Sequence, residues 1–582
     1  MAWGKCLAAF FVAGLAISIS HSSEARDFIV DSVIDLPARE LSSENCEAES
    51  GRCTLRAAIQ KANLLFDRGE TDHRILLGPG EYLLSVEGPG EDGARTGDLD
   101  IRSNITITDN DSGTGKDFCV LHCSNAQTIN IIIDGNNIDR VFHIVSGKVT
   151  IENVIIRNGR IDNAPGGGIY NEDELTLLNV ALLRNLSNKG GGLSSSGASS
   201  LTKVDIKSNG YLVSHTVHSD KVGGGIHNSG NMAISDAHIE GNFSKFKGGG
   251  IANEGPGAEL SVTDAVIFSN RVPITDEITL PGLMLNPRGG GVFNSGSMSI
   301  TGTEIYMNLG KNGGGVWNEG TMELDKVAVY RNKTRDVYPG DSLYRGGGIG
   351  NYSSAMPGSV ITIKESAIYE NRAGVGGGIY NLDGRVRFTN STVSSNVADS
   401  TSAGIYCEDG VLEFSNSTYY RNFVRLGGST FSNTHSLGAH SCEITIKNSL
   451  FVEDRHSTMH LEDTRVNSLD YNYSTRAHFV QDRFGNPLSP HDLGGGVPTG
   501  IGPLQNNGGP APTHALTSGG GVDYIPPGNC TDLDGAPLRT DQRGFTRPIG
   551  VGCDIGAYEK LDFNFILSFP PGHFLRRAYG IN

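Results

Sequence analysis

The stretch Gly-Gly-Gly-Ile-Tyr-Asn, "GGGIYN", occupies residues 166–171 and recurs letter for letter at residues 376–381. Between the two copies lie related hexamers, and each unit also holds a second landmark, in which an aliphatic residue or tyrosine is followed by two residues and an asparagine. The related triple-glycine copies begin at residues 190, 223, 248, 289, 313 and 346, with degenerate copies at 402 and 427, and the second landmark ends at Asn185, Asn209, Asn242, Asn270, Asn308, Asn332, Asn371, Asn396 and Asn422.

Apolar and polar residues alternate between the landmarks, as in Met232 and Ile234 or Leu260 and Val262. This period of two residues is typical of strands and not of helices. Short strands separated by glycine and asparagine corners, in units of roughly 20 to 30 residues, describe a solenoid whose units bury their apolar faces by stacking. The sequence therefore predicts an all-β protein, a right-handed parallel β-helix. Leucine-rich repeats and propeller blades would need patterns that are not present.

Stacked coils explain the glycines, because parallel strands lie about 4.8 Å apart and each corner faces the same corner above and below. A Cβ atom there would clash, or would strain a backbone with positive φ. The recurring asparagines are expected to be structural, since asparagine tolerates the left-handed region and stacked amides form ladders. The aliphatic residue after each corner is expected to point inward in one column: Ile169, Ile226, Ile251, Val292, Val316, Ile349, Ile379 and Ile405.

The chain has 582 residues and a formal net charge of −17, with no basic stripe of the kind that binds nucleic acid. Lys5 precedes an apolar run from Leu7 to Ile19, and small residues follow near Ala25. This pattern predicts a signal peptide over 1–25 and export. The alternative, a membrane anchor, is disfavoured because the run is shorter than the roughly 20 residues that span a bilayer. No later segment is long and apolar enough to span.

Eight cysteines remain after the signal, an even number that suits an oxidising compartment. Pairing of sequence neighbours is the simplest expectation, although sequence alone does not fix connectivity. A zinc site is the alternative for the second pair. The expected pairs are Cys46 with Cys53, Cys119 with Cys123, Cys407 with Cys442, and Cys530 with Cys553.

The solenoid is expected from about residue 75 to about 460, and its open ends need caps. The stretch "CTLRAAIQKANLLF" at 53–66 places Leu55, Ala58, Ile59 and Ala62 on one helical face, which predicts a short helical N-terminal cap.

Three features resemble modules of exported bacterial proteins. "CTLRAAIQKAN" resembles the N-terminal module named for its CSLREA motif, with Ala57 where the motif has glutamate, and this gives an expected cap region at 26–74. The triple-glycine and Ile-x-x-Asn pairing resembles the repeats of polymorphic outer-membrane proteins. "TDQRGFTRPIGVGCDIGAYE" at 540–559 resembles the end of a choice-of-anchor Q domain, expected at 461–559. The resemblance implies a bacterial exported or surface protein, but the tail at 560–582 shows no sorting motif or autotransporter barrel, which leaves the mode of attachment open.

Catalytic motifs are not evident. A polysaccharide lyase would need calcium-binding carboxylates and a basic residue, and an inverting hydrolase would need paired carboxylates. The sequence lacks a pectinase-like "NTD", "DD" and "GHG" set. No cofactor is expected, although weak calcium binding stays possible at three acidic pairs, each of which is also explained as a solvated turn. These pairs are Asp98 with Asp100, Asp109 with Asp111, and Asp532 with Asp534.

Three repeat intervals exceed the shortest one by roughly 9, 17 and 9 residues, and their extra residues fall at the same corner, in 210–222, 271–288 and 333–345. Insertions on one edge of a solenoid often mark the binding face, and aromatic residues with mixed charges suit a glycan or a protein partner. Tolerated surface loops are the alternative. The candidate ligand-binding residues are Tyr211, His215, His218, Asp220, Asp276, Glu277, Arg288, Arg335, Asp336, Tyr338, Asp341, Tyr344 and Arg345.

The sequence thus favours a secreted or cell-surface β-helix protein that is not an enzyme. Its expected partner is a polysaccharide, a host surface or an envelope component, and not nucleic acid. A polysaccharide lyase or glycoside hydrolase acting on an acidic polysaccharide is the competing hypothesis, because fold alone is weak evidence of function.

Overall fold

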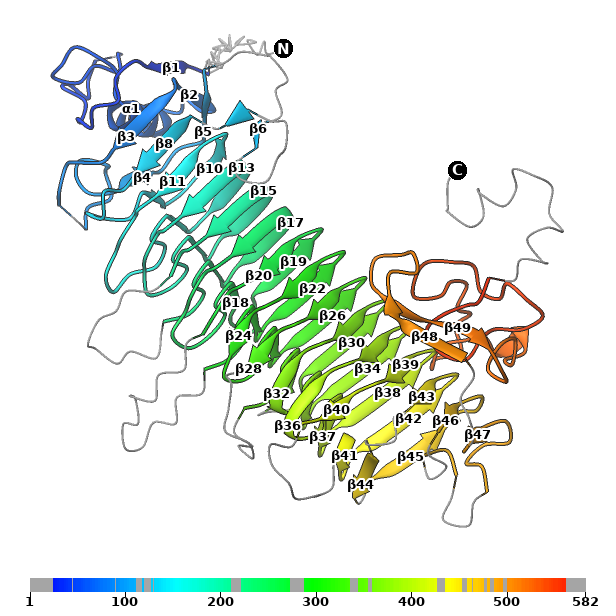
Figure 1. Cartoon of the computed structure of the whole chain (residues 1–582). Helices are drawn as coiled ribbons and strands as arrows, with labels where there is room; N and C mark the ends of the chain where they lie inside the picture. The colour runs from blue at the N-terminus through cyan, green and yellow to red at the C-terminus, as the bar shows by residue number, and fades with distance from the viewer. Residues whose placement is uncertain are drawn as a thin grey trace, which may run out of the picture.

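The computed structural model describes residues 25–561, apart from 44, 89, 111–117, 120–126, 129, 211–220, 273–286, 335–343, 354–357, 426–434, 453–457, 463, 476–478, 482–485 and 496–499. Its strands stack in one elongated column of coils that runs from the N-terminal cap towards β45 (Figure 1). Among the described residues the strands of neighbouring coils pair in parallel, as where Met298 pairs with Met322 and Ile300 with Leu324, and the register shifts locally in β32 and β41. The predicted all-β class and the parallel β-helix are confirmed.

Most coils contribute two stretches to a 27-stranded sheet, called the main sheet below. Its strands are β1 (Asp27–Val30), β2 (His73–Leu77), β3 (Gly80–Leu83), β5 (Ile105–Asp109), β8 (Ile131–Asp134), β10 (Lys148–Glu152), β11 (Ile155–Arg157), β13 (Glu174–Leu183), β15 (Ala198–Lys207), β17 (Asn231–Glu240), β19 (Glu259–Thr263), β20 (Val266–Phe268), β22 (Ser297–Thr301), β23 (Glu304–Tyr306), β26 (Thr321–Asp325), β27 (Ala328–Tyr330), β30 (Val360–Lys364), β31 (Ala367–Tyr369), β34 (Arg385–Thr389), β35 (Thr392–Ser394), β38 (Val411–Ser415), β39 (Thr418–Tyr420), β42 (Glu443–Lys447), β43 (Leu450–Val452), β45 (Arg465–Ser468), β46 (Tyr473–Ser474) and β47 (Leu493–Gly494).

The strands that directly follow the triple glycines belong to a second sheet of 13 strands, called the glycine-side sheet. A third sheet has five short strands, β24 (Leu309–Gly310), β28 (Lys333–Thr334), β32 (Arg372–Val375), β36 (Val397–Thr401) and β40 (Phe423–Val424), and β6 (Phe118–Cys119) pairs with β7 (Gln127–Thr128). The glycine-side strands are β4 (Leu99–Ile101), β9 (Phe142–Ile144), β12 (Ile169–Asn171), β14 (Leu193–Ser195), β16 (Ile226–Asn228), β18 (Ile251–Asn253), β21 (Val292–Asn294), β25 (Val316–Asn318), β29 (Ile349–Tyr352), β33 (Ile379–Leu382), β37 (Ile405–Glu408), β41 (His435–His440) and β44 (Thr458–Glu462).

The triple-glycine corners meet both predicted constraints. Gly313, the first glycine of its triplet, has φ +64°, in the left-handed region that a side chain rarely adopts. A Cβ on Gly314, the second glycine, would lie 2.4 Å from the carbonyl oxygen of Lys333 and 2.5 Å from that of Gly347 in the next coil. The glycines therefore allow one coil to rest directly on the next.

Aliphatic and asparagine columns fill the interior. The eight aliphatic residues predicted to follow the corners are all fully buried. In the asparagine column, the backbone N–H and the side-chain Nδ2 of Asn308 both donate to Oδ1 of Asn332, each at 3.0 Å. A second column, at the ends of the glycine-side strands, links Asn294 Nδ2 to Asn318 Oδ1 at 2.7 Å. These bonds satisfy buried amides, so the structural role predicted for the asparagines is confirmed.

Helix α1 (Leu55–Asp67) closes the N-terminal end of the stack, which confirms the predicted helical cap. Thr54 caps it by accepting a hydrogen bond from the Ala57 N–H at 3.1 Å. The parallel ladder already begins at β1, which pairs with β2, and it continues to β47. It thus extends beyond the expected 75–460 range at both ends, because chain segments with weaker repeat signals still add parallel strands.

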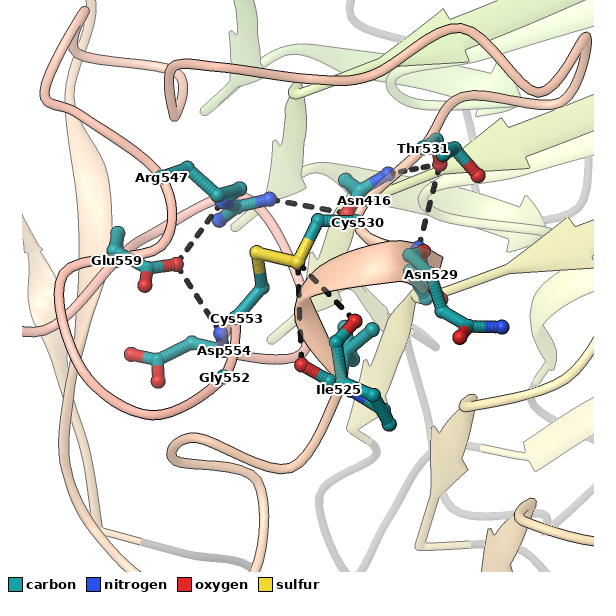
Figure 2. Close-up of a disulfide and its surroundings, with 12 residues drawn as sticks. Asn416, Ile525, Asn529, Cys530, Thr531, Arg547, Gly552, Cys553, Asp554 and Glu559 are labelled. Carbon is teal, nitrogen blue, oxygen red and sulfur yellow. Dashed lines mark hydrogen bonds and ion pairs between the residues drawn. A yellow bond between two sulfur atoms is a disulfide. The ribbon is translucent and has the colours of Figure 1, made fainter.

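The last part of the chain, here called the C-terminal module (residues 500–561), folds back against the side of the final coils (Figure 1). It contains the antiparallel pair β48 (Gly500–Gln505) and β49 (Thr513–Ser518) and the short 3-10 helix η2 (Pro527–Asn529). Figure 2 shows how it is fastened. Arg547 pairs with Glu559 at 3.0 Å and donates to Asn416 Oδ1 at 3.1 Å, and Asn416 donates to the Thr531 carbonyl oxygen at 3.1 Å.

Three of the four expected disulfides are present, Cys46–Cys53, Cys407–Cys442 and Cys530–Cys553, so those pairings are confirmed. Cys123, the expected partner of Cys119, lies outside the described residues, as do residues 1–24 of the predicted signal peptide and the last residues of the tail. Within the described part of the chain, none of the helices has the length and apolar character needed to cross a membrane.

Candidate functional site on the glycine-side sheet

The middle residue of each short glycine-side strand points away from the coil interior, because strand residues alternate between faces. In β21, β25 and β33 these residues are Phe293, Trp317 and Tyr380. All three rings are nevertheless almost fully buried. Something outside the coil must therefore cover them.

Basic residues at the corners provide part of that cover. Lys247, Arg288 and Arg345 each directly precede a triple glycine. Lys247 Nζ lies 4.7 Å from the centroid of the Phe293 ring, and the Arg288 and Arg345 guanidinium carbons lie 5.6 Å and 5.1 Å from the rings of Trp317 and Tyr380. In each case a cation of one coil covers a ring of the following coil.

Carboxylates complete the arrangement. Glu254 pairs with Lys247 at 2.5 Å, and Glu319 pairs with Arg288 while accepting a hydrogen bond from Trp317 Nε1 at 2.8 Å. Contacts with His227, and then with Lys247, lower the pKa of Glu254 to about 2, whereas burial lowers the pKa of Arg288. The same combination recurs at the N-terminal end, where Arg140 lies 5.5 Å from the Tyr170 ring. We call this array the cation–aromatic band; it comprises Arg140, Lys247, Arg288 and Arg345, then Tyr170, Phe293, Trp317 and Tyr380, and finally Glu172, Glu254, Glu319 and Glu408.

A cluster around His143, the outward residue of β9, continues the band beyond Tyr170. His143 Nδ1 lies 3.2 Å from Asp100 Oδ1, and its Nε2 lies 3.2 Å from Glu172 Oε2. The imidazole stacks on the Tyr170 ring with centroids 5.1 Å apart. The acidic pair noted in the sequence thus has different partners, because Asp98 pairs with Arg140 at 2.6 Å while Asp100 faces His143.

Burial strongly affects these acids and bases. It raises the pKa of Asp98 to about 7, with the nearby Asp100 charge adding to the effect. Burial opposes the charged form of His143, but hydrogen bonds to Asp100 and Glu172 outweigh it and raise the pKa of the imidazole. A cluster with a near-neutral acid and an oriented histidine has the chemistry for proton transfer or metal binding.

The structure describes three of the thirteen predicted site residues. Arg288 and Arg345 belong to the band, and Tyr344 is buried beside it, where its carbonyl oxygen accepts from the Val375 N–H at 3.0 Å. The other ten lie outside the described residues: Tyr211, His215, His218, Asp220, Asp276, Glu277, Arg335, Asp336, Tyr338 and Asp341.

The described ends of the three insertions keep one register. Parallel bridges join Val222 to Lys247, Lys247 to Arg288, Arg288 to Asn312 and Asn312 to Arg345. The insertions therefore return to one edge of the coil, next to the band, and successive insertions are two coils apart.

Sequence reasoning missed much of this site. A usable signal was present in the basic residue that precedes several triple glycines and in the acidic residue soon after the following Asn, as in Lys247 and Glu254. The His143 cluster had no comparable signal, because its members come from three segments that only folding brings together.

No protein-family model matches the chain, and no curated protein matches it. Among solved structures, the chain is similar to the A-module of the mannuronan C-5 epimerase AlgE4 from Azotobacter vinelandii, with 13% identity and a TM-score of 0.30, covering 76% of this chain and 96% of that one. For pectate lyase Pel9A the identity is 12% and the TM-score 0.30, with coverage of 93% and 97%. For tailspike protein 3 of bacteriophage CBA120 they are 11% and 0.34, with coverage of 74% and 61%.

Proposed function

We propose that the protein is an exported, non-enzymatic binding protein that holds an extended glycan along the cation–aromatic band. The observation that carries this proposal is the recurrence of a cation over a ring on several coils of the same face, with a paired carboxylate beside Lys247 and Arg288. Coils repeat about every 4.8 Å. A linear polymer offers its own repeating groups to such a row, so each added coil adds contacts of the same kind.

The chemistry of the band suits sugar hydroxyl groups, which both donate and accept hydrogen bonds. Glu254 and Glu319 are acceptors, and Lys247 and Arg288 are donors, all on one edge. Lys247 and Arg288 are each paired with a carboxylate of the band, which favours a polar ligand of low charge density over a polyanion. A nucleic-acid partner is disfavoured by the formal net charge of −17.

Export is supported by the three disulfides, which persist in oxidising compartments. The sequence resemblances to exported bacterial proteins support attachment of this protein to a bacterial outer surface.

Binding to a glycan array tests the proposal, using the mature chain and a triple variant, Lys247→Gln, Arg288→Gln and Arg345→Gln. We expect the variant to lose at least tenfold in affinity for every glycan that the parent binds. The matched control is Arg331→Gln, Lys364→Gln and Arg385→Gln, which removes three cations whose ion pairs lie on the main sheet. Equal losses in both triple variants, or no loss in the first, would contradict a role for the band.

A second function, cleavage of an acidic polysaccharide, is favoured by one observation. Asp98, with its pKa raised to about 7, and His143 lie beside Arg140, a cation suited to a uronate carboxylate. Incubation of the mature chain with uronate polysaccharides, with and without calcium, distinguishes the two functions. Release of unsaturated or reducing ends that Asp98→Asn abolishes would establish the enzymatic function in place of simple binding.

A further inference from the structure

We propose that Asp92, Asp100 and His143 form a binding site for a divalent transition-metal ion, best matched by Zn²⁺, on the outside of the first coils. This inference does not depend on the proposed glycan binding, because the three residues lie at the N-terminal end of the glycine-side sheet. One donor atom from each residue faces a common space, and all three atoms lie within 4.8 Å of one another.

The distances suit a small ion. His143 Nδ1 lies 3.2 Å from Asp100 Oδ1 and 4.0 Å from Asp92 Oδ1. Zinc binds nitrogen and carboxylate oxygen at about 2.0 to 2.2 Å in tetrahedral sites, which places neighbouring ligand atoms roughly 3.4 Å apart. A small movement of Asp92, whose side chain is 74% exposed, brings the third donor into this range.

The other side of the imidazole is held as in metal sites. A metal-bound histidine usually donates its second ring N–H to a carboxylate, which fixes the tautomer and the ring orientation. Here Nε2 lies 3.2 Å from Glu172 Oε2, and the Tyr170 hydroxyl donates to Glu172 Oε1 at 2.8 Å. Glu172 and Tyr170 thus act as positioning residues that leave Nδ1 for the metal.

The N-terminal cap builds the other half of the site. Helix α1 contacts both β4 and the loop before it. Gln60 Nε2 donates to the Ala94 carbonyl oxygen in the loop at 2.8 Å, and Asn63 Nδ2 donates to the Asp100 carbonyl oxygen in β4 at 2.8 Å. The Ala94 N–H in turn donates to Asp100 Oδ2 at 2.9 Å. Asp100 is fully buried, and this bond leaves its Oδ1 facing His143.

Charge also favours a dication here. Asp98 is compensated by Arg140 at 2.6 Å, so Asp92 and Asp100 contribute two negative charges beside a single imidazole nitrogen. A nitrogen donor selects zinc over calcium, which prefers oxygen ligands. Without a metal, a protonated His143 bridges Asp100 and Glu172, so proton and metal compete for the same nitrogen.

Metal titration of the mature chain tests the site, after removal of bound metal with a chelator and dialysis. We expect one equivalent of Zn²⁺ to bind in competition with a chromophoric chelator, and Ca²⁺ in tenfold excess not to displace it. Asp92→Asn and His143→Gln should each weaken Zn²⁺ binding at least tenfold. Because Asp92 is exposed, its substitution does not endanger the fold, and far-ultraviolet circular dichroism checks both variants.

His491 provides the matched control. Its ring stacks on Tyr471 with centroids 4.7 Å apart, and its Nδ1 lies 2.6 Å from Asp470, so it copies the histidine, tyrosine and aspartate part of the site. His491→Gln should leave Zn²⁺ affinity unchanged. Absence of a zinc equivalent, displacement by Ca²⁺, or unchanged affinity in Asp92→Asn would each overturn the assignment.

Discussion

Two columns of outward aromatic rings repeat with the coils of this protein, yet their surroundings differ. On the main sheet, Phe268, Tyr306, Tyr330 and Tyr369 form a tyrosine ladder, with successive centroids 5.1, 4.9 and 4.9 Å apart and nearly parallel planes. On the glycine-side sheet, the rings of the cation–aromatic band lie under basic side chains, and Tyr380 also stacks on Tyr406 with centroids 5.2 Å apart. Identical rung spacing therefore produces two different surfaces.

Small residues interrupt the glycine-side column at two places. Gly350 follows Trp317 in the outward column, and a Cβ on Gly350 would lie 2.1 Å from Trp317 Cε3, so the indole spreads over the glycine. Ala252 likewise interrupts the column before Phe293. In the ladder no small residue intervenes, and neighbouring rings cover one another's faces. The ladder thus stacks ring on ring, while in the band charged groups lie over the rings.

The largest effect expected concerns the end of the ladder column, where the C-terminal module covers it. His514 Nε2 accepts from the Ser394 hydroxyl at 2.7 Å, and its Nδ1–H donates to the Gly502 carbonyl oxygen at 2.9 Å. Burial lowers the pKa of His514 from 6.5 to about 4. The folded state therefore binds this proton more weakly than the unfolded chain does. The contribution of neutral His514 to the free energy of unfolding is fully present above pH 6.5. It is lost as the pH falls from 6.5 towards 4, and the loss is at most about 3 kcal/mol.

Thermal unfolding of the parent and of His514→Gln at pH 7 and pH 4.5 measures this effect. The parent should lose more stability on acidification than the variant, because glutamine does not titrate. If both chains respond equally to pH, the module is not held by a neutral histidine.

The next effect concerns the ladder itself. Tyr330 stacks between Tyr306 and Tyr369, and Tyr330→Ala removes both stacking contacts and part of a half-buried side chain. We expect a loss of about 2 kcal/mol in the free energy of unfolding, measured by chemical denaturation. Tyr330→Phe keeps both stacks and loses only the hydroxyl bond to Glu304 at 2.8 Å, so its loss should be below about 1 kcal/mol. A loss in the phenylalanine variant as large as in alanine would mean that the hydroxyl, and not the stacking, stabilises the ladder.

The interior of the coils, behind both aromatic columns, was largely predictable from sequence. Each coil must meet the same three constraints with its own residues. It needs a glycine at the corner, an aliphatic residue after that corner, and an asparagine three residues after another aliphatic residue. Residues such as Ile349 and Asn332 therefore repeat in the sequence, and the structure places them where the repeat predicts.

The outer surface was less predictable, because its contacts join different coils. Arg288 precedes a triple glycine in the sequence, but its ring partner, Trp317, belongs to the next coil, and no repeat specifies that pair. His143 and Asp100 meet because β9 pairs in parallel with β4, a strand whose Asp100 carbonyl oxygen is also held by Asn63 of α1. Proximity of this kind depends on tertiary packing.

A smaller effect is expected for the cation of the band. Arg288 is largely buried between Trp317 and Tyr352 and pairs with Glu319. Arg288→Gln should lower the free energy of unfolding by about 1 kcal/mol, because a ring contact and an ion pair are lost together. Arg288→Lys, which keeps the charge but not the planar group, should recover about half of that loss in the same denaturation measurement. Full recovery with lysine would show that charge alone matters.

The smallest effect sharpens the comparison from the ladder side. Arg331 follows Tyr330 and pairs with Glu370 at 2.7 Å, and both side chains are well exposed. Water and salt screen such a pair, so Arg331→Gln should cost less than about 0.5 kcal/mol in the free energy of unfolding. Denaturation at low and at high salt should give nearly the same value for parent and variant. A loss as large as that for Arg288→Gln would contradict the difference drawn between the two columns. Cations would then stabilise the ladder and the band by the same amount.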